Sequence, residues 1–253
     1  MSEEVSGSKV LIAQNLTKVY SGSAEPAVKN LTIEITEREI FGLLGPNGAG
    51  KTTVISMMTT LLKPTEGSIL IHGIDLLRHP KEAKKLIGYV PQDLALYPNL
   101  SARENLRFLG RVQGLSGKTL EKRVSECLDL VGLEKSADRR VYTYSGGMKR
   151  RTNLAAGILN KPRVLFLDEP TVGIDPQSRN LILERLSAMK KDTTMIYTTH
   201  YMGEVEHLCS RVAIMDFGSI IVQGTTGELM ACAPGSKSLE DVFIALTGRQ
   251  LRD

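Results

Sequence analysis

Apolar and polar positions alternate along several short stretches of the chain, and a few stretches are almost wholly apolar. Val10–Asn15 and Leu31–Ile35 show the period-two alternation of strands with one buried face. Ile40–Leu44 is apolar at nearly every position, which is typical of a strand buried on both faces. Further strands are predicted at Ser68–His72, Ile87–Val90, Arg163–Leu167, Met195–Thr198, Val212–Met215 and Ser219–Val222.

Stretches with helical periodicity lie between these strands. A helix is predicted after the glycine-rich segment 45–53 and is expected to end at about Leu62. Others are predicted from about Pro176 to Lys190, near Met202–Leu208 and from Ser238 to Gly248. Alternation of strands and helices predicts an α/β fold with a mostly parallel sheet.

The stretch from 93 to 160 has a different character. It contains no convincing strand, and its apolar residues fall at helical spacing within 106–112 and 124–131. We therefore expect a helical subdomain inserted between strands of the α/β core.

Composition places the chain among ordinary globular proteins. Its 253 residues include 42% hydrophobic and 24% charged residues, which excludes a disordered, collagen-like or disulfide-scaffold protein. Lys and Arg number 32 against 28 Asp and Glu, a net charge of +4. So mild an excess does not require a nucleic-acid or membrane-surface partner.

Cysteine usage and hydropathy bear on the compartment. The three cysteines lie far apart in the sequence and form no CxxC pair, which favours reduced thiols in a cytosolic protein. No apolar run approaches the ~18 residues of a membrane span. The start of the chain, 1–9, is acidic and polar, unlike a secretory signal. A membrane role is therefore expected to be peripheral, through a partner.

A glycine-rich phosphate motif follows the apolar run 40–44. Glycines let backbone N–H groups curl around an anion, and the helix that follows adds its positive N-terminal end. A lysine at the motif's end reaches the β- and γ-phosphates, and the next hydroxyl can ligate Mg²⁺. The motif does not distinguish a kinase, a GTPase and a transport ATPase. It comprises Gly45, Pro46, Asn47, Gly48, Ala49, Gly50, Lys51, Thr52 and Thr53.

Two carboxylates end the predicted buried strand that begins at Arg163. Ligands of parallel sheets bind at the carboxyl ends of the strands, so Asp168 is expected near the phosphates, where it would hold Mg²⁺ directly or through water. Period-two alternation predicts that Glu169 points to the other side of the strand. There it can act as general base toward an attacking water.

A second anion-ready segment precedes a predicted helix. Ser145, Gly146 and Gly147 combine a hydroxyl, free N–H groups and a helix N-terminus. Taken in isolation, the segment reads more simply as a capped helix with a basic first turn. One nucleotide does not need two phosphate sites on one chain, whereas a head-to-tail dimer would use both.

The order of these motifs resembles the nucleotide-binding subunit of an ABC transporter, from about Val10 to Gly227. The aromatic residue that stacks on adenine in this family falls at Tyr20, the Walker A loop at Gly45–Thr53 and the Q-loop glutamine at Gln92. The signature falls at Ser145–Gly147, and the Walker B strand with its glutamate at Arg163–Glu169. The D-loop falls at Gly173–Pro176 and the switch histidine at His200.

The resemblance implies a P-loop NTPase core with an N-terminal antiparallel β part and the inserted helical subdomain. It implies ATP and Mg²⁺ as ligands, with Gln92 contributing to Mg²⁺ or to the attacking water. His200 would contact the γ-phosphate and orient Glu169 or the water, and Tyr20 would stack on adenine. The D-loop match adds Asp175 to the nucleotide-binding residues.

The signature departs from the family's usual pattern at two positions. Tyr144 and Met148 replace the Leu and Gln that flank Ser-Gly-Gly, which puts any contact through that glutamine in doubt. The combination Tyr-Ser-Gly-Gly-Met, together with the tail 238–243, looks similar to ATPases of drug, polysaccharide and lipid exporters.

The expected function is an ATPase subunit that energises a separate transmembrane exporter through a nucleotide-sandwich dimer. One alternative is a soluble ABC-type ATPase of DNA repair or translation. Such chains resemble tandem cassettes or carry long coiled-coil insertions, whereas only about fifty residues separate Gln92 from Ser145 here. Another is a P-loop kinase or GTPase, but the Asn-Lys-x-Asp guanine motif is missing because Pro162-Arg163 follows Asn160-Lys161.

The expected organisation is one ABC-type ATP-binding domain over 1–253. Its α/β core would span about 10–93 and 162–227, its helical subdomain about 94–161, and a C-terminal helical extension 228–253. The expected partners are a transmembrane permease subunit and a second nucleotide-binding subunit in a homodimer, without nucleic acid. The expected location is cytoplasmic, at the cytoplasmic face of the membrane.

Overall fold

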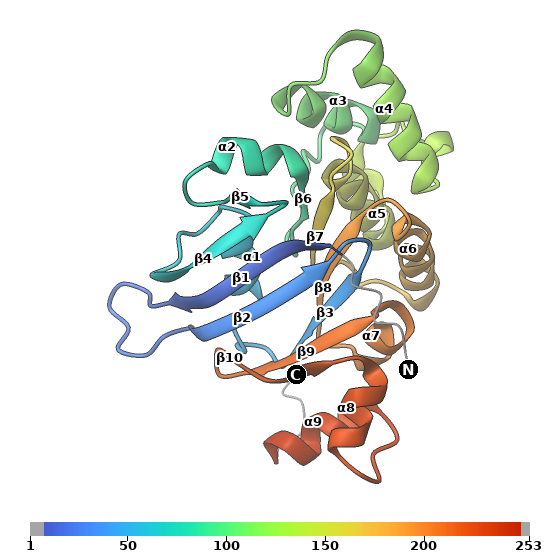
Figure 1. Cartoon of the computed structure of the whole chain (residues 1–253). Helices are drawn as coiled ribbons and strands as arrows, with labels where there is room; N and C mark the ends of the chain where they lie inside the picture. Colours follow the sequence, from blue (N-terminus) through green and yellow to red (C-terminus); the bar gives the residue numbers. More distant parts are fainter. Residues whose placement is uncertain (1–7, 249–253) are drawn as a thin grey trace.

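A computed structural model describes residues 8–248, so the two ends of the predicted domain, 1–7 and 249–253, lie outside the described residues. Most of the acidic and polar stretch 1–9 lies outside them too. Two sheets form the frame of the molecule (Figure 1). The first has four antiparallel strands in the order β2-β1-β4-β5. Its strands are β1 (Lys9–Lys18), β2 (Val28–Thr36), β4 (Glu66–Ile71) and β5 (Ile74–Asp75). The expected N-terminal antiparallel part is confirmed.

The second sheet has six strands in the order β10-β9-β3-β8-β7-β6. Its five strands from β9 to β6 run parallel, and β10 pairs antiparallel with β9 at the edge. The carboxyl ends of the parallel strands therefore meet at one edge, where a ligand crevice is expected. The strands are β3 (Ile40–Leu44), β6 (Ile87–Val90), β7 (Val164–Asp168), β8 (Thr194–Thr199), β9 (Arg211–Asp216) and β10 (Ser219–Gly224).

Helices complete the predicted α/β fold. The helical subdomain, green to yellow in Figure 1, holds α3 (Ala102–Val112), α4 (Gly117–Leu130) and α5 (Gly146–Gly157), with short 3₁₀ turns at Glu134–Ser136 and Val141–Thr143. The remaining helices are α1 (Lys51–Met58), α2 (Pro80–Ala83) with a 3₁₀ turn at Lys84–Leu86, α6 (Pro176–Met189), α7 (Met202–Leu208), α8 (Thr226–Cys232) and α9 (Leu239–Thr247).

Strand β7 shows why the central strands of the six-stranded sheet have continuously apolar sequences. Val164 and Phe166 face the core shared with the antiparallel sheet and α1. Leu165 and Leu167 face the opposite core, which includes the helical subdomain and α6. Both faces of the strand are buried, so every position is apolar until the strand reaches Asp168.

The predicted end of the first helix was wrong. Helix α1 ends at Met58 instead of Leu62, because Thr60 adopts a left-handed φ of 66° and the amides of Leu61 and Leu62 turn back to the Ser56 carbonyl. Short β5 and α2 were not expected. Helix α8 begins at Thr226, two residues before the predicted extension, with a Thr225–Glu228 capping box that the sequence displays.

Candidate functional site

The phosphate motif forms a loop between β3 and α1 at the carboxyl edge of the large sheet. A Cβ on Gly45 would lie 2.4 Å from the Met215 carbonyl oxygen, so only glycine fits there. Gly50 adopts φ 103°, and a Cβ on it would lie 2.7 Å from the Ala27 carbonyl oxygen. The loop opens onto a cavity of about 280 Å³, which is lined by 47–53 together with Ala27, Gln92 and Glu169.

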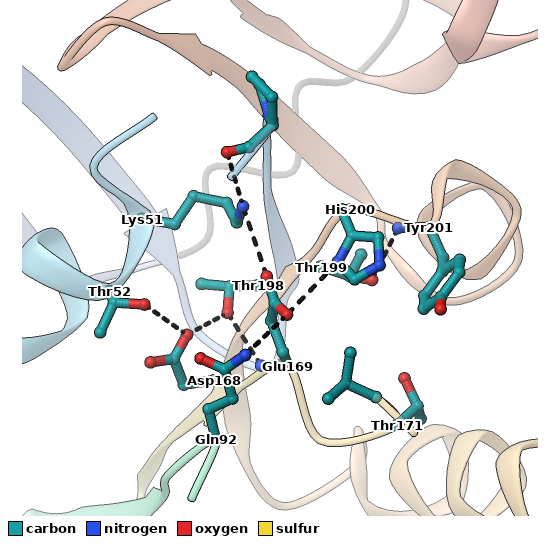
Figure 2. Close-up of polar contacts among 12 residues, drawn as sticks. Lys51, Thr52, Gln92, Asp168, Glu169, Thr171, Thr198, Thr199, His200 and Tyr201 are labelled. Carbon is teal, nitrogen blue, oxygen red and sulfur yellow. Dashed lines mark hydrogen bonds and ion pairs between the residues drawn. The ribbon is translucent and has the colours of Figure 1, made fainter. Parts of the chain in front are cut away.

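Lys51, the first residue of α1, extends into the loop. Its Nζ donates to the carbonyl oxygens of Gly45 at 2.7 Å and Pro46 at 3.1 Å, and lies 3.5 Å from Glu169 Oε1 (Figure 2). The ammonium is buried, and this desolvation lowers its pKa, although the negative charge of Glu169 opposes the shift. A buried cation beside loop amides is suited to bind phosphate oxygens.

Asp168 ends β7 and turns its carboxylate toward α1. Its Oδ1 accepts hydrogen bonds from the hydroxyls of Thr198 at 2.7 Å and Thr52 at 3.4 Å (Figure 2). Its Oδ2 is buried and has no hydrogen-bond partner among residues 8–248. Burial raises the pKa of this carboxyl.

The arrangement around Asp168 fits a divalent cation. The unpartnered Oδ2 and the Thr52 hydroxyl supply hard oxygen donors at one place. Within 8–248 there is no cluster of three or more His, Cys, Asp or Glu that could form an all-protein cage. Mg²⁺ normally completes its shell with water and substrate phosphates, so a sparse donor set of this kind suits it.

Glu169 lies beyond the end of the strand, at a turn of the backbone. Its φ is 47°, in the left-handed region, and its N–H donates to the Thr198 carbonyl at 3.2 Å and hydroxyl at 3.1 Å. Glu169 lines the phosphate cavity, where its carboxylate faces Lys51. Strand β7 ends at Asp168, so the direction of the Glu169 side chain is set by this turn, and the two carboxylates contact different partners.

The Glu169 carboxylate is the meeting point of three motifs. Its Oε2 lies 3.3 Å from His200 Nδ1 and accepts from Gln92 Nε2 at 3.3 Å, while Oε1 faces Lys51 (Figure 2). His200 follows β8, and Gln92 follows β6, at the start of the path into the helical subdomain. The structure thus brings together the predicted residues Lys51, Thr52, Gln92, Asp168, Glu169 and His200.

Tyr20 lies at the rim of this site. Its hydroxyl is 3.2 Å from the Thr53 hydroxyl, and its side chain is 44% exposed. The Lys18 Nζ lies 5.7 Å from the ring centroid. An exposed ring beside the phosphate loop is available for stacking, as predicted, and adenine as its partner stays a prediction.

The signature segment lies apart from the phosphate cavity. Ser145 is the N-cap of α5 and accepts from the Met148 N–H at 3.3 Å, and both Ser145 and Gly146 are exposed. Gly147 is buried against Ser178, in the first turn of α6. None of the predicted residues Ser145, Gly146, Gly147 and Asp175 is among the described residues that line the phosphate cavity.

Asp175 has a local role in this arrangement. Its Oδ1 accepts the N–H of Ser178 at 2.9 Å, so it caps α6 and holds that helix start against the signature. Tyr144 is likewise explained locally. It is buried in the helical subdomain, its hydroxyl donates to the Ser136 carbonyl at 2.5 Å, and burial raises its pKa.

Sequence reasoning missed three residues that support the site. Thr198 holds both Asp168 and the Glu169 amide, and Arg150 of α5 donates to the backbone carbonyls of Gln92 and Val172. Glu204 of α7 is buried and accepts a hydrogen bond from the hydroxyl of Thr199, the residue before His200. The available signals were two threonines in an apolar strand before His200 and a glutamate within the predicted helix 202–208.

Known proteins resemble this chain in sequence. A model of the ABC transporter family matches residues 28–172. A linearmycin resistance ATP-binding protein of Bacillus subtilis is 46% identical over 239 residues, 94% of this chain and 75% of that protein. A daunorubicin/doxorubicin resistance ATP-binding protein of Streptomyces peucetius is 40% identical over 222 residues, 87% of this chain and 67% of that protein.

Solved structures resemble the fold. An ATP-binding subunit of an ABC transporter superposes with a TM-score of 0.83 at 29% identity, covering 94% of this chain and 99% of that one. A dimeric ATP-binding cassette in a post-hydrolysis state with ADP and Pi superposes with a TM-score of 0.78 at 27% identity, covering 85% and 98%.

Within residues 8–248, no helix combines the length and apolarity needed to cross a membrane. The family match covers more than half of the chain, and the motifs of the site occur in one continuous order along it. This protein therefore belongs to the ABC transporter family, as one of its ATP-binding and ATP-hydrolysing cassettes.

Proposed function

We propose that this chain is the energy-coupling ATPase of an exporter. Two copies close head to tail around two MgATP, hydrolyse them, and drive a separate transmembrane permease from the cytoplasmic face of the membrane. The expected domain boundaries, from the α/β core to the extension 228–253, form part of this proposal.

One observation carries the dimer. The phosphate cavity and the signature are two half-sites of one chain that do not meet, and the donors of the second half-site are exposed. The hydroxyl of Ser145 and the amides of the Gly146–Gly147 turn would close on the γ-phosphate held by the other copy. A solved cassette that is similar to this chain is a dimer bound to ADP and Pi, which supports this arrangement.

The geometry supports the following order of events. The amides of the phosphate loop and the Lys51 ammonium bind the phosphates, with Nζ turning from the Gly45 and Pro46 carbonyls. Thr52, Asp168 and Gln92 would hold Mg²⁺, which neutralises charge on the β- and γ-phosphate oxygens when bound.

Hydrolysis then needs a positioned water and a proton acceptor. The water oxygen attacks the γ-phosphorus in line as the bond to the ADP oxygen breaks. Glu169 accepts the water proton, and His200, 3.3 Å from its carboxylate, orients it toward the γ-phosphate. Inorganic phosphate and ADP are the products, and their separation from the signature reopens the dimer.

The exporter assignment rests on the named relatives. Both are ATP-binding proteins of drug resistance, and a third relative, 40% identical over 232 residues, is a Nod factor export ATP-binding protein of Cupriavidus metallidurans. The name of the third relative states export, and all three relatives are similar over most of this chain. The cargo would be selected by the permease, because no cargo pocket is needed on the ATPase.

Glu169→Gln tests the proposal. The variant should bind ATP as the wild type does, lose hydrolysis, and form an ATP-dependent dimer that sedimentation detects. Its matched control, Ser145→Ala with Glu169→Gln, should bind ATP and dimerise more weakly. Glu169→Gln that binds ATP but stays monomeric at high concentration, with and without its membrane partner, would contradict the sandwich.

Fractionation separates the exporter from the other classes. The proposal predicts co-purification with a polytopic membrane protein. Exclusive association with ribosomes or DNA would instead favour a soluble ATPase of translation or repair. Comparison of ATP and GTP turnover without an acceptor tests the kinase and GTPase alternatives.

A further inference from the structure

We infer that Glu204 is a positioning residue for ATP hydrolysis, whose buried carboxylate holds the His200 segment and the loop after Glu169 in register with each other. The inference rests on the proposed roles of Glu169 and His200 and names what fixes their geometry. Glu204 lies on α7 and is 5% exposed.

The Glu204 carboxylate has partners on both oxygens. Oε1 accepts from the Thr171 hydroxyl at 2.8 Å and lies 3.4 Å from the Arg179 Nε. Oε2 accepts from the hydroxyls of Tyr197 at 2.7 Å and Thr199 at 3.0 Å. These partners come from β8, from the loop after β7 and from α6, so one side chain of α7 connects three elements of the site.

The first connection fixes the backbone on both sides of His200. The Thr199 hydroxyl donates to Glu204. The same hydroxyl oxygen accepts from the Tyr201 N–H at 2.9 Å, so it holds the backbone on both sides of His200 (Figure 2). The Arg179 guanidinium lies 4.5 Å from the Tyr201 ring centroid. The His200 and Tyr201 rings lie 4.1 Å apart, so the imidazole is held against an anchored neighbour.

The second connection fixes the loop that carries Glu169. Glu169 has a left-handed φ of 47°, a conformation that a residue with a Cβ keeps only where its surroundings impose it. The Val172 N–H donates to the Glu169 carbonyl at 3.3 Å, and Thr171, between them, is buried and tied to Glu204. Loss of the tie frees this turn while the strand that precedes it stays paired.

A purely packing role does not require a carboxylate here. Burial of a carboxylate is unfavourable unless hydrogen bonds and charge compensate for its lost hydration, and apolar residues would fill the same volume at lower cost. The hydrogen-bond partners of Glu204 lie in the segments that carry Glu169 and His200. The Glu169 Oε2 and His200 Nδ1 atoms lie 3.3 Å apart, where the attacking water is proposed to bind. The phosphate cavity, by contrast, has no contribution from Glu204 among its described lining residues.

Glu204→Gln separates positioning from binding. The amide keeps the shape but presents an NH₂ group to hydroxyl and guanidinium donors. We expect kcat for ATP to fall about tenfold, equivalent to ~1.4 kcal/mol at the transition state, with KM and the equilibrium affinity for ATP unchanged. The matched control is Glu206→Gln on the same helix, where the exposed carboxylate accepts the Leu239 N–H at 2.7 Å outside the site.

A spectroscopic readout distinguishes positioning from loss of stability. The imidazole NMR signals of His200 should shift in Glu204→Gln and not in Glu206→Gln. If Glu204→Gln does not fold, Thr171→Val removes one donor at nearly constant volume and should lower kcat with KM unchanged. A lowered melting temperature with wild-type kcat and unshifted His200 signals would overturn the inference.

Glu169→Gln measured in parallel separates this inference from the proposed function. If Glu169→Gln still hydrolyses ATP, the proposed function fails, whatever Glu204→Gln does. If Glu169→Gln is inactive and both Glu204→Gln and Thr171→Val turn over as the wild type does, only the positioning inference fails.

Discussion

Gly147, in the first turn of α5, is a position where the structure predicts a marked loss of stability from one added methyl group. A Cβ there would lie 2.1 Å from the Ser178 Oγ and 2.6 Å from the Ser178 Cβ, whereas a Cβ on the adjacent Gly146 would find its nearest neighbour, the Gly173 carbonyl oxygen, at 3.7 Å. Neither glycine has a positive φ, so alanine is compatible with the backbone at both. The two substitutions therefore differ in packing alone.

The expected magnitude follows from these distances. Ordinary carbon contacts are about 3.5–4.0 Å, so Gly147→Ala must separate the starts of α5 and α6 by roughly 1 Å. Overpacking of this kind costs about 1–3 kcal/mol. Replacing glycine by alanine in a helix returns up to about 1 kcal/mol. We expect Gly147→Ala to lower the free energy of unfolding by about 1–2 kcal/mol and Gly146→Ala to leave it unchanged or slightly higher.

Urea denaturation without nucleotide measures this difference. Ser178→Gly removes the Ser178 Cβ and should restore much of the stability lost in Gly147→Ala, whereas Ser178→Ala keeps that Cβ and should restore less. Gly146→Ala should be stable yet weak in ATP-dependent dimerisation, because its methyl group projects from the exposed signature. Equal stability of the two alanine variants, or no rescue by Ser178→Gly, would refute the packing argument.

Three further predictions concern the phosphate site. Lys51→Ala should weaken ATP binding by about tenfold or more, since a charged hydrogen bond contributes ~1.5–3 kcal/mol; fluorescent-nucleotide titration measures it, and unchanged affinity would remove Lys51 from phosphate binding. Burial raises the pKa of Asp168, so its stabilising contribution is present below its ordinary pKa and is lost as pH rises through the raised value. Asp168→Asn should therefore have a higher melting temperature than the wild type at neutral pH, and the difference should shrink on acidification. The variant should also lose Mg²⁺-dependent turnover. Thermal scans without Mg²⁺ at several pH values measure the difference, and a difference that grew toward acid pH would contradict the prediction. Tyr20→Ala should weaken binding of ATP but not of inorganic triphosphate, and equal losses for both ligands would exclude stacking on the base.

Local sequence patterns predicted the buried strands and the glycine-rich loop, because burial and backbone approach constrain the residue types at each of these positions. Ile40–Leu44 and 164–167 are almost wholly apolar because both faces of their strands are buried. Gly45 and Gly50 are required because the backbone there approaches Met215 and Ala27 closely. The order of motifs then identified Gln92 and His200 through a resemblance, since neither side chain alone indicates a site.

Other features depend on contacts between distant parts of the chain. The Glu169 side chain turns into the cavity because the hydroxyl of Thr198, 29 residues away, accepts a hydrogen bond from the Glu169 N–H. Helix α1 stops at Met58 through a left-handed Thr60, a torsion that periodicity does not report. The partners of Glu204 come from 171 to 199, so a pattern read over a few residues could not place that carboxylate in a network.

The central claim is that one triphosphate lies between the phosphate loop of one copy and the signature of another. Disulfide trapping tests it directly, with Asn47→Cys and Met148→Cys on separate chains that also carry Glu169→Gln, so that the Ser145 hydroxyl and the signature amides stay in place. Cys232→Ser removes the one native cysteine that is exposed among the described residues. The account predicts a covalent dimer that forms with ATP and only when the two chains are mixed; an ATP-saturated mixture that stays uncrosslinked, or crosslinks equally without ATP, would contradict it.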